Sequence, residues 1–367
     1  MEKEKKTAFK RLHSLDALRG FDMFWIAGGA AIFLGLGKAF PGPGFDKFLE
    51  QFEHVPWEGM HFFDLIWPLF MFIMGVAIPF SVARRRAEGS SDRSTLLHAA
   101  KRAAIMFLLG TVTQGNLLLF DLSKFRPCYS VLHGLAAGYL IATIVVLKVK
   151  SEWHPATIGI FLLVYWAIIM FVPVPGIGAG VLTPDGNIAT YIDQLILGRF
   201  HFGANTWFLS YLGFGSSVLL GVLAGHILMD TDDSPGKIFR LLVLGSVYLL
   251  AGILWSLFFP VIKLLWTSSF VLIGGAISFF ILTLFYWIID VLGYRKWAFI
   301  FTVIGMNSIA VYLAISLFDF SKISNVFVGN LLPLLGQWAA LTSALATFAV
   351  VWSILYWMYL RKEFIRI

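Results

Sequence analysis

Long apolar segments that almost lack charge dominate this chain. A helix needs about 20 mostly apolar residues to cross the hydrocarbon region of a bilayer, because it rises only about 1.5 Å per residue. Within the 367 residues, ten segments meet this requirement: 16–37, 61–83, 97–119, 129–147, 156–173, 206–228, 238–260, 265–290, 297–318 and 335–359. Only helices and closed barrels satisfy their backbone groups inside lipid, so the pattern predicts an all-α polytopic transmembrane bundle of about ten helices.

The composition excludes an ordinary soluble protein. The chain is 59% hydrophobic and 13% charged, and its mean hydropathy is +0.81. Soluble domains carry about 25% charged residues. We therefore expect one transmembrane domain over residues 1–367, without a separate soluble domain. Segment 16–37 follows a basic stretch, 1–15, as the apolar part of a signal peptide would. No clear small-residue site for signal-peptide cleavage follows it, so we interpret the segment as a retained first helix.

The net charge of +7 is explained by topology. With the N-terminus in the cytoplasm, twenty Lys and Arg residues lie on the cytoplasmic side and seven on the opposite side. This asymmetry follows the positive-inside rule, so we expect cytoplasmic termini, long outer loops at 38–60 and 174–205, and a bacterial inner-membrane location. Nucleic-acid binding is not expected.

Cysteine and histidine usage argues against a metal centre. The lone Cys128 forms no intrachain disulfide and cannot build a thiolate site. None of the eight histidines occurs in an H-x-x-x-H or H-E-x-x-H pattern, so no metal cofactor is expected.

Charged residues inside the first two apolar segments are candidates for function. Each costs about 2.5–3.5 kcal/mol at the centre of a membrane helix. Asp16 and Arg19 lie three residues apart and share a helix face. They form either a salt bridge at the inner membrane boundary or, through Arg19, part of a site for an anionic ligand.

His54 and Asp64 form the sharper candidate, near the outer end of the second segment. A carboxylate beside an imidazole fixes its tautomer and raises its basicity, as a general base or nucleophile requires. The alternative is an ordinary interfacial histidine. His61 is a second candidate at the same mouth. Asn307 lies inside the ninth segment. Its amide either forms hydrogen bonds between helices or donates to a substrate carbonyl oxygen.

Several motifs together resemble one known family. They are RLHSLDALRG at 11–20, HVPWEGMHFFDLIWPLFMFIMGVAI at 54–78, YIDQ at 191–194, KLLWTSSF at 263–270 and GMNSIAVY at 305–312. Over nearly its whole length the chain is similar to the transmembrane acyltransferase family of heparan-α-glucosaminide N-acetyltransferase and its bacterial relatives. The resemblance implies a membrane bundle, often dimeric, that moves an acetyl group from cytosolic acetyl-CoA to a sugar amine on the far side.

The resemblance also implies roles for individual residues. His54 stands where the family has the histidine implicated in transfer, as base or acyl carrier. Asp64 and Asn307 match polar positions of the family's motifs, and Lys263 matches a lysine before Leu-Trp. We expect the acceptor to meet four residues at the outer mouth: Trp57, His61, Arg126 and Lys263.

The donor is a large anion, and basic residues cluster near the predicted cytoplasmic opening. We expect Arg19, Arg84, Arg85, Lys101 and Arg102 to bind the CoA phosphates through charge-assisted hydrogen bonds. The alternative is that the residues in the loop between the second and third segments only determine the topology.

Two stretches depart from the family pattern. Many relatives have Gly-Val-Leu-Gln-Arg at the start of the fourth helix, where this chain has Ser130-Val131-Leu132-His133-Gly134. Relatives also carry Asp-Pro-Glu-Gly before the sixth helix, where residues 209–213 read LSYLG. The missing arginine and carboxylates indicate either a branch with another acceptor or one without catalysis.

Three functions compete at this point. The first is an acetyl-CoA-dependent acyltransferase acting on the amine or hydroxyl of a periplasmic sugar or glycan, with membrane lipid around it and a homodimer as its possible assembly. The second is a transporter or flippase for a glycan or lipid precursor, which paired broken helices would favour. The third is a non-catalytic membrane scaffold.

Overall fold

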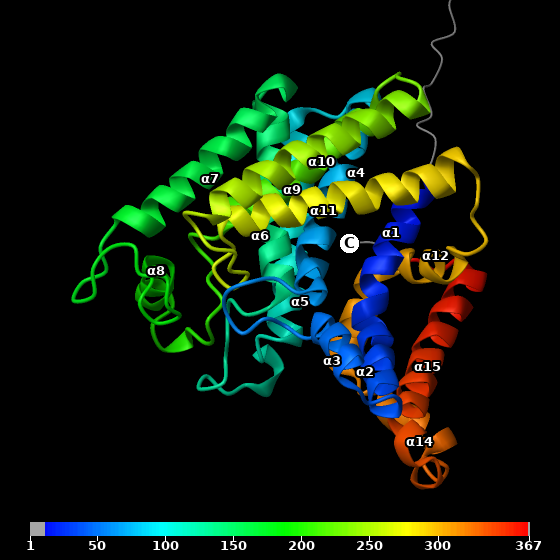
Figure 1. The fold of residues 1–367 in the computed structure, drawn as a ribbon. Coiled ribbons are helices and arrows are strands. Elements are labelled where there is room, and N and C mark those ends of the chain that lie inside the picture. Colours follow the sequence, from blue (N-terminus) through cyan, green and yellow to red (C-terminus); the bar gives the residue numbers. More distant parts are fainter. Residues whose placement is uncertain (1–11, 366–367) are drawn as a thin grey trace, which may run out of the picture.

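Helices make up most of the computed structural model, which describes residues 12–365 (Figure 1). No β-strand occurs in that part of the chain. The α-helices are α1 His13–Phe24, α2 Ala30–Ala39, α3 Pro43–Leu49, α4 Ile66–Ala87, α5 Asp92–Thr113, α6 Val131–Lys148, α7 His154–Phe171, α8 Ile188–Leu197, α9 Tyr211–Met229, α10 Ser234–Ser256, α11 Ser268–Phe285, α12 Phe299–Gly305, α13 Ser308–Leu317, α14 Phe320–Val328 and α15 Ala339–Arg361. The all-α prediction is confirmed. Residues 1–11 of the predicted basic N-terminal stretch lie outside the described residues.

The predicted membrane spans correspond to helices of the structure. Between residues 12 and 365, nine helical stretches are long and apolar enough to cross a membrane, and α12 with α13 makes a tenth if counted as one span. The ninth predicted segment is wrong in one respect, because α12 and α13 meet at an angle of 74° instead of forming one helix. The backbone of Asn307 leaves the helical region there, with φ −127° and ψ 33°.

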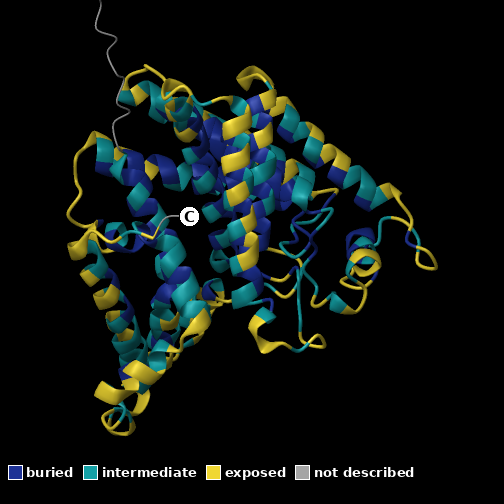
Figure 2. Ribbon diagram, turned by 180° about the vertical axis from the view of Figure 1, so that it is seen from behind, coloured by how far each residue is buried: buried dark blue, intermediate teal, exposed yellow. Residues whose placement is uncertain are grey.

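The helices α4 and α9 form the centre of the bundle. In α9, 83% of the most apolar window is buried, against 17% in α10 and 11% in α15. Figure 2 shows this contrast between the dark centre and the exposed outer helices. A Cβ atom at Gly75 would collide with the Val218 carbonyl, and one at Gly221 with the Phe72 carbonyl. These glycines let the two backbones touch, as small residues do in membrane bundles.

Helix α1 is held against α12 in the same way. A Cβ atom at Gly20 would collide with the Phe301 carbonyl, and one at Gly305 with the Asp16 carbonyl. The start of α1 is capped by Asp290, whose carboxylate accepts hydrogen bonds from the backbone N–H groups of His13 and Ser14 at 3.1 and 3.0 Å. Helix α1, with Arg19, therefore has a fixed position relative to the break after α12.

One acidic residue of α1 is buried without the hydrogen bonds that usually accompany a buried carboxylate. Asp22 is fully buried, and neither of its carboxylate oxygens has a hydrogen-bond partner within residues 12–365. A buried polar group without a partner destabilises the fold. Asp22 therefore contributes a cost to the packing of α1 rather than a contact.

Three segments, distant in sequence, are joined at one end of the bundle, which is the outer end on the predicted topology. The backbone N–H of Gly59 donates to the Val261 carbonyl at 2.8 Å, and Glu58 and Ile262 form an isolated β-bridge. The indole N–H of Trp57 donates to the Leu182 carbonyl at 2.9 Å. The loop before α4 is thereby attached to the turn between α10 and α11 and to the loop between α7 and α8.

Asp193 in α8 gives a prediction on stability. Its buried carboxylate accepts from the backbone N–H groups of Trp207 and Phe208 at 2.7 and 3.1 Å. Burial raises the pKa of Asp193 from 3.8 to about 6. The folded state thus binds this proton more tightly than the unfolded state does. Protonated Asp193 therefore contributes up to about 3 kcal/mol to the free energy of unfolding below pH 3.8, and this contribution is lost as the pH rises through 6.

We expect Asp193→Asn to flatten the dependence of unfolding temperature on pH between about pH 4 and 6.5. The measurement is thermal unfolding in detergent, with the wild type as reference, since groups common to both proteins cancel. An unchanged slope in the variant would contradict the assignment to Asp193.

Candidate active site

Asp64 organises the outer end of α4. It is 1% exposed and lies in a 3-10 turn, Phe62–Leu65, directly before the helix. One carboxylate oxygen, Oδ2, accepts hydrogen bonds from the backbone N–H groups of His61 at 3.0 Å and Val55 at 3.3 Å. A short acidic side chain near a helix start satisfies N–H groups that the helix leaves free. Asp64 therefore anchors the preceding loop to α4.

The other oxygen of Asp64 contacts His54. Its Oδ1 lies 2.7 Å from His54 Nδ1, and the imidazole is 55% exposed at the mouth of the bundle. The ring also packs on Phe63, with centroids 4.9 Å apart. When Nδ1 carries the proton and donates it to Asp64, Nε2 has a free lone pair. The structure thus brings together the histidine and carboxylate that the sequence proposes as a pair.

Lys263 completes this cluster from the turn between α10 and α11. Its Nζ lies 3.0 Å from Asp64 Oδ1 and 2.9 Å from His54 Nδ1, and the side chain is 15% exposed. Burial lowers the pKa of Lys263 below its ordinary value, while the Asp64 charge opposes that shift. The tautomer of His54 decides which of its contacts is a hydrogen bond. If Nδ1 carries a proton, it donates to Asp64; if Nδ1 carries none, it accepts from Lys263.

We call His54, Asp64 and Lys263 the outer triad. Asp64 receives four contacts and is the fixed centre, and His54 is the exposed member. A histidine oriented by a buried carboxylate, with its second nitrogen free, is the arrangement that general bases use. The outer triad is therefore a candidate active site.

The remaining predicted outer residues take different positions. His61 lies beside the outer triad, because its backbone N–H bonds Asp64, and its Nδ1 lies 3.0 Å from the Glu53 carbonyl. The Trp57 indole bonds the Leu182 carbonyl. Arg126 bonds the carbonyls of Ser123 and Phe125, and its guanidinium lies 4.7 Å from the Phe202 ring centroid. The structure thus brings His61 to the outer triad, whereas the hydrogen bonds of Trp57 and Arg126 go to other parts of the chain.

The stretches that depart from the family pattern have structural roles. His133 is buried, and its Nδ1 accepts from the backbone N–H groups of Tyr129 and Ser130 at 3.0 and 3.1 Å. Its Nε2 lies 3.1 Å from both the Phe107 carbonyl and the Thr111 hydroxyl. Ser210 donates to the Leu265 carbonyl at 3.1 Å and so supports the turn that carries Lys263.

Asn307 does not join the outer triad. Its amide Nδ2 donates to the Glu363 carbonyl at 3.1 Å, and its Oδ1 accepts from the Ile365 N–H at 3.0 Å. It is 1% exposed. The side-chain carbonyl oxygen and one N–H of the amide are therefore used by the segment that follows α15.

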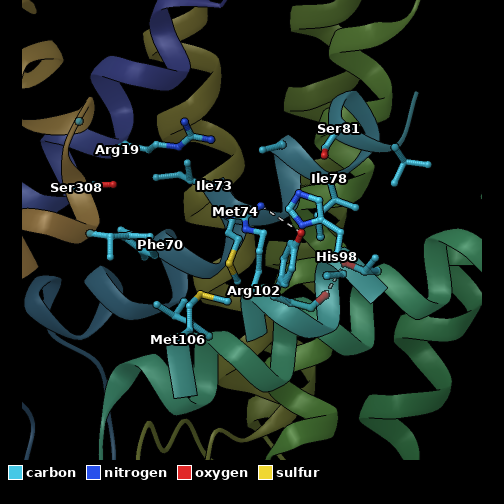
Figure 3. A pocket seen from close by; sticks show the side chains of 18 of the residues that line it. Arg19, Phe70, Ile73, Met74, Ile78, Ser81, His98, Arg102, Met106 and Ser308 are labelled. Carbon is cyan, nitrogen blue, oxygen red and sulfur yellow. Dashed lines mark hydrogen bonds between the residues drawn. The ribbon is translucent and has the colours of Figure 1, made fainter. Parts of the chain in front are cut away.

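A cavity of about 770 Å³ extends along the other part of α4, from Phe70 to Arg85. Its walls also come from α1, α5, α6, the break between α12 and α13, and the segment after α15. Figure 3 shows Arg19 on one side of this space and His98 and Arg102 on the other. On the predicted topology this cavity belongs to the cytoplasmic half. We call it the inner cavity.

Four of the five predicted CoA-binding residues line the inner cavity: Arg19, Arg84, Arg85 and Arg102. Arg19 lies 3.7 Å from Asp16, as the shared helix face predicts. Arg102 donates to the Tyr139 hydroxyl at 3.2 Å, with its guanidinium 4.9 Å from that ring's centroid. Lys101 is exposed and lies outside the cavity, because adjacent residues of a helix point about 100° apart.

Sequence reasoning missed several cavity residues. Thr95, His98 and Met106 recur with the predicted Arg102 at intervals of three or four residues along α5 and share its inner face. This spacing could have identified His98. Tyr139, Phe364 and Ile365 also line the cavity, and no spacing relates them to α5. Among residues 12–365, no three His, Cys, Asp or Glu side chains converge as metal ligands do.

The inner cavity and the outer triad lie along one helix. Phe70, the cavity residue of α4 nearest its outer end, follows Asp64 by six residues, which is about 9 Å along a helix axis. The Trp67 ring lies in this interval of α4 and packs on Trp207, Phe214 and Trp266, with centroids 6.2, 5.4 and 4.6 Å away. The triad residues do not line the cavity.

Comparisons with known proteins bear on the family of the chain. Residues 11–118 match a family described as a domain of unknown function, DUF5009. The chain is 29% identical over 322 residues to heparan-alpha-glucosaminide N-acetyltransferase of Mus musculus, with 71% of this chain and 48% of the relative covered. It is 26% identical over 368 residues to the Homo sapiens protein of the same name, with 84% and 53% covered. The chain spans about half the length of these relatives, and the family resemblance that the motifs indicate is confirmed.

Proposed function

We propose that this chain is a transmembrane acetyltransferase that takes an acetyl group from acetyl-CoA in the inner cavity and transfers it at the outer triad. The acceptor is the amine or hydroxyl of a sugar or glycan on the opposite side of a bacterial inner membrane. The observation that carries the proposal is the arrangement along α4, with four arginines around a cavity at one part and a carboxylate-bound histidine beyond its other end. The similarity to two proteins named as N-acetyltransferases supports it.

The inner cavity has the chemistry that acetyl-CoA requires. Guanidinium groups bind phosphates through paired charge-assisted hydrogen bonds, and four of them border one space. Phe70, Ile73, Met74 and Ile78 supply an apolar wall along α4. The phosphates would bind Arg84 and Arg85 near the predicted cytoplasmic end, and the slender thioester arm would extend along α4 toward Asp64.

The outer triad would provide the base. His54 Nε2 takes the proton from the acceptor amine while the amine nitrogen attacks the thioester carbonyl. The new C–N bond forms, the C–S bond breaks, and the thiolate of CoA leaves. The proton on the His54 imidazolium passes to the thiolate, directly or through water, and this restores the neutral base. Asp64 holds the ring in the tautomer that leaves Nε2 free and stabilises the imidazolium that forms, while Lys263 keeps the carboxylate ionised.

One observation favours a transporter, and it is weaker. Transporters use discontinuous helices, and the pair α12 and α13 is broken. Within residues 12–365, however, this is the one pair bent by more than 40°, whereas repeat-built transporters carry two discontinuous helices in corresponding positions. The break at Asn307 is occupied by backbone from the segment after α15.

The direct test uses proteoliposomes with acetyl-CoA inside and a panel of amino sugars outside. We expect release of free CoA inside and N-acetylated sugar outside, dependent on both substrates. Movement of an intact sugar without acetylation would instead establish transport, and failure of purified protein to bind acetyl-CoA would overturn the proposal. An acetylated histidine trapped without acceptor would replace direct transfer by a two-step reaction.

The arginines of the inner cavity give a further prediction. Removing the guanidinium in Arg85→Ala or Arg102→Ala should raise the KM for acetyl-CoA about tenfold or more, with kcat nearly unchanged, because a charge-assisted contact to phosphate contributes about 1.5–3 kcal/mol. Lys101→Ala is the matched control, since Lys101 points away from the cavity. Equal effects of Lys101→Ala and Arg102→Ala would contradict a specific phosphate site.

A further inference from the structure

The segment after α15 turns back toward the bundle. Lys362 has a left-handed backbone with φ 58°. The N–H groups of Lys362 and Glu363 donate to the carbonyls of Tyr359 and Met358 at 3.1 and 3.0 Å. These bonds close the end of α15 and redirect the chain, as in helix ends with a left-handed residue. Residues 363–365, here called the strap, follow this turn.

The side chain of Asn307 holds the strap by its backbone. The amide donates to the carbonyl of Glu363 and accepts from the N–H of Ile365, two residues further on. This pair of bonds imitates the contact that a neighbouring β-strand makes. Because Asn307 is 1% exposed, the two bonds are shielded from water and satisfy an amide that would otherwise be buried without partners.

The strap forms part of the inner cavity. Phe364 and Ile365 line it together with Gly305, Met306 and Ser308 of the break. Ile365 is 52% exposed although it is apolar, so the cavity wall on this side presents hydrocarbon rather than charge. The guanidinium groups stand on α1, α4 and α5, and the apolar strap completes the enclosure.

We infer that Asn307 is a positioning residue that latches residues 363–365 into the wall of the donor cavity, where Phe364 and Ile365 contact the uncharged arm of the acyl donor. This inference rests on the proposed function. It assigns Asn307 to donor binding, a role that differs from the two open from the sequence, donor to a substrate oxygen and contact between helices.

Two measurements on purified protein in detergent test the latch and the wall separately. Strap mobility is read from a spin label on Glu363→Cys in a Cys128→Ser background, since the Glu363 side chain is exposed and the bonds that hold this residue are made by its backbone N–H and carbonyl. Donor affinity is read as the Kd of CoA by calorimetry. The variants are Asn307→Ala, Asn307→Asp and the double variant Phe364→Ala/Ile365→Ala. Asn325→Ala, an exposed asparagine on α14, is the control.

We expect Asn307→Ala to increase label mobility and to weaken CoA binding about tenfold. Asn307→Asp keeps the acceptor but loses the donor, and should give an intermediate result. The Phe364→Ala/Ile365→Ala variant should weaken CoA binding by a similar factor while the label stays immobile, and it tests the wall even if Asn307→Ala does not fold. At saturating acetyl-CoA, all three should approach the wild-type rate of transfer.

Unchanged mobility in Asn307→Ala would overturn the latch. Unchanged or tighter CoA binding in the double variant would overturn the wall, and tighter binding would mean that the strap blocks the cavity. If neither the wild type nor Asn325→Ala binds CoA, the proposed function fails and the inference fails with it. That result is distinct from one in which all the proteins bind CoA equally.

Discussion

Replacing His54 by alanine should lower the rate of acetyl transfer about 10²–10⁴-fold, the range that general-base catalysis contributes. The Kd of acetyl-CoA should stay within about twofold of the wild type, because His54 does not line the inner cavity. Stability should hardly change, since the ring is 55% exposed. The measurements are single-turnover transfer from bound acetyl-CoA to a saturating amino sugar, and calorimetric binding.

The matched control is His201→Ala, which removes an imidazole from another outer loop, between α8 and α9. Its transfer rate should equal that of the wild type. A His54→Ala protein that keeps more than about a tenth of the wild-type rate would show that another group takes the proton. Loss of acetyl-CoA binding in His54→Ala would place the histidine in donor binding instead.

Removing the carboxylate of Asp64 should damage both activity and folding. Asp64→Ala leaves Lys263, which is 15% exposed, without its counter-charge, and frees the loop that contains Val55 and His61. Breaking such a buried pair costs about 3 kcal/mol or more. We expect a lower unfolding temperature in detergent, and transfer reduced to the level of His54→Ala.

A double-mutant cycle separates these contributions. Lys263→Met alone leaves the Asp64 carboxylate buried without its ammonium partner, and should also destabilise the protein. The double variant Asp64→Ala/Lys263→Met contains no unpaired charge, so it should be more stable than the sum of the single changes predicts, by about 1–3 kcal/mol. Additive losses would mean that the two side chains do not interact. In both variants that lack the Asp64 carboxylate, transfer should remain low, because His54 has lost its orienting partner.

The membrane spans were the most predictable part of the fold, because hydropathy over about 20 residues decides whether a helix crosses a bilayer. The break at Asn307 escaped this reasoning, since one amide in an apolar segment hardly alters the mean hydropathy. Its cause lies outside the segment, in the backbone of Glu363 and Ile365 that the side chain binds. A long-range partner of this kind leaves no local signal.

The candidate site was predictable to different degrees. His54 and Asp64 are ten residues apart, and the structure pairs them, but spacing alone also fits an interfacial histidine. Lys263 lies 199 residues from Asp64, and only the family resemblance connects the two in the sequence. Among the basic residues, Lys101 and Arg102 look equivalent in the sequence, and the rotation of α5 decides that Arg102 faces the cavity.

The backbones of α1 and α12 touch where Gly20 meets the Phe301 carbonyl and Gly305 meets the Asp16 carbonyl. Interdigitation this close leaves neither helix free to slide or roll along the other. Arg19, the break at Asn307 and the strap should therefore move as one rigid body. Any widening that admits a bulky nucleotide must then come from the opposite border, where α4 and α5 are joined by the short turn around Gly89.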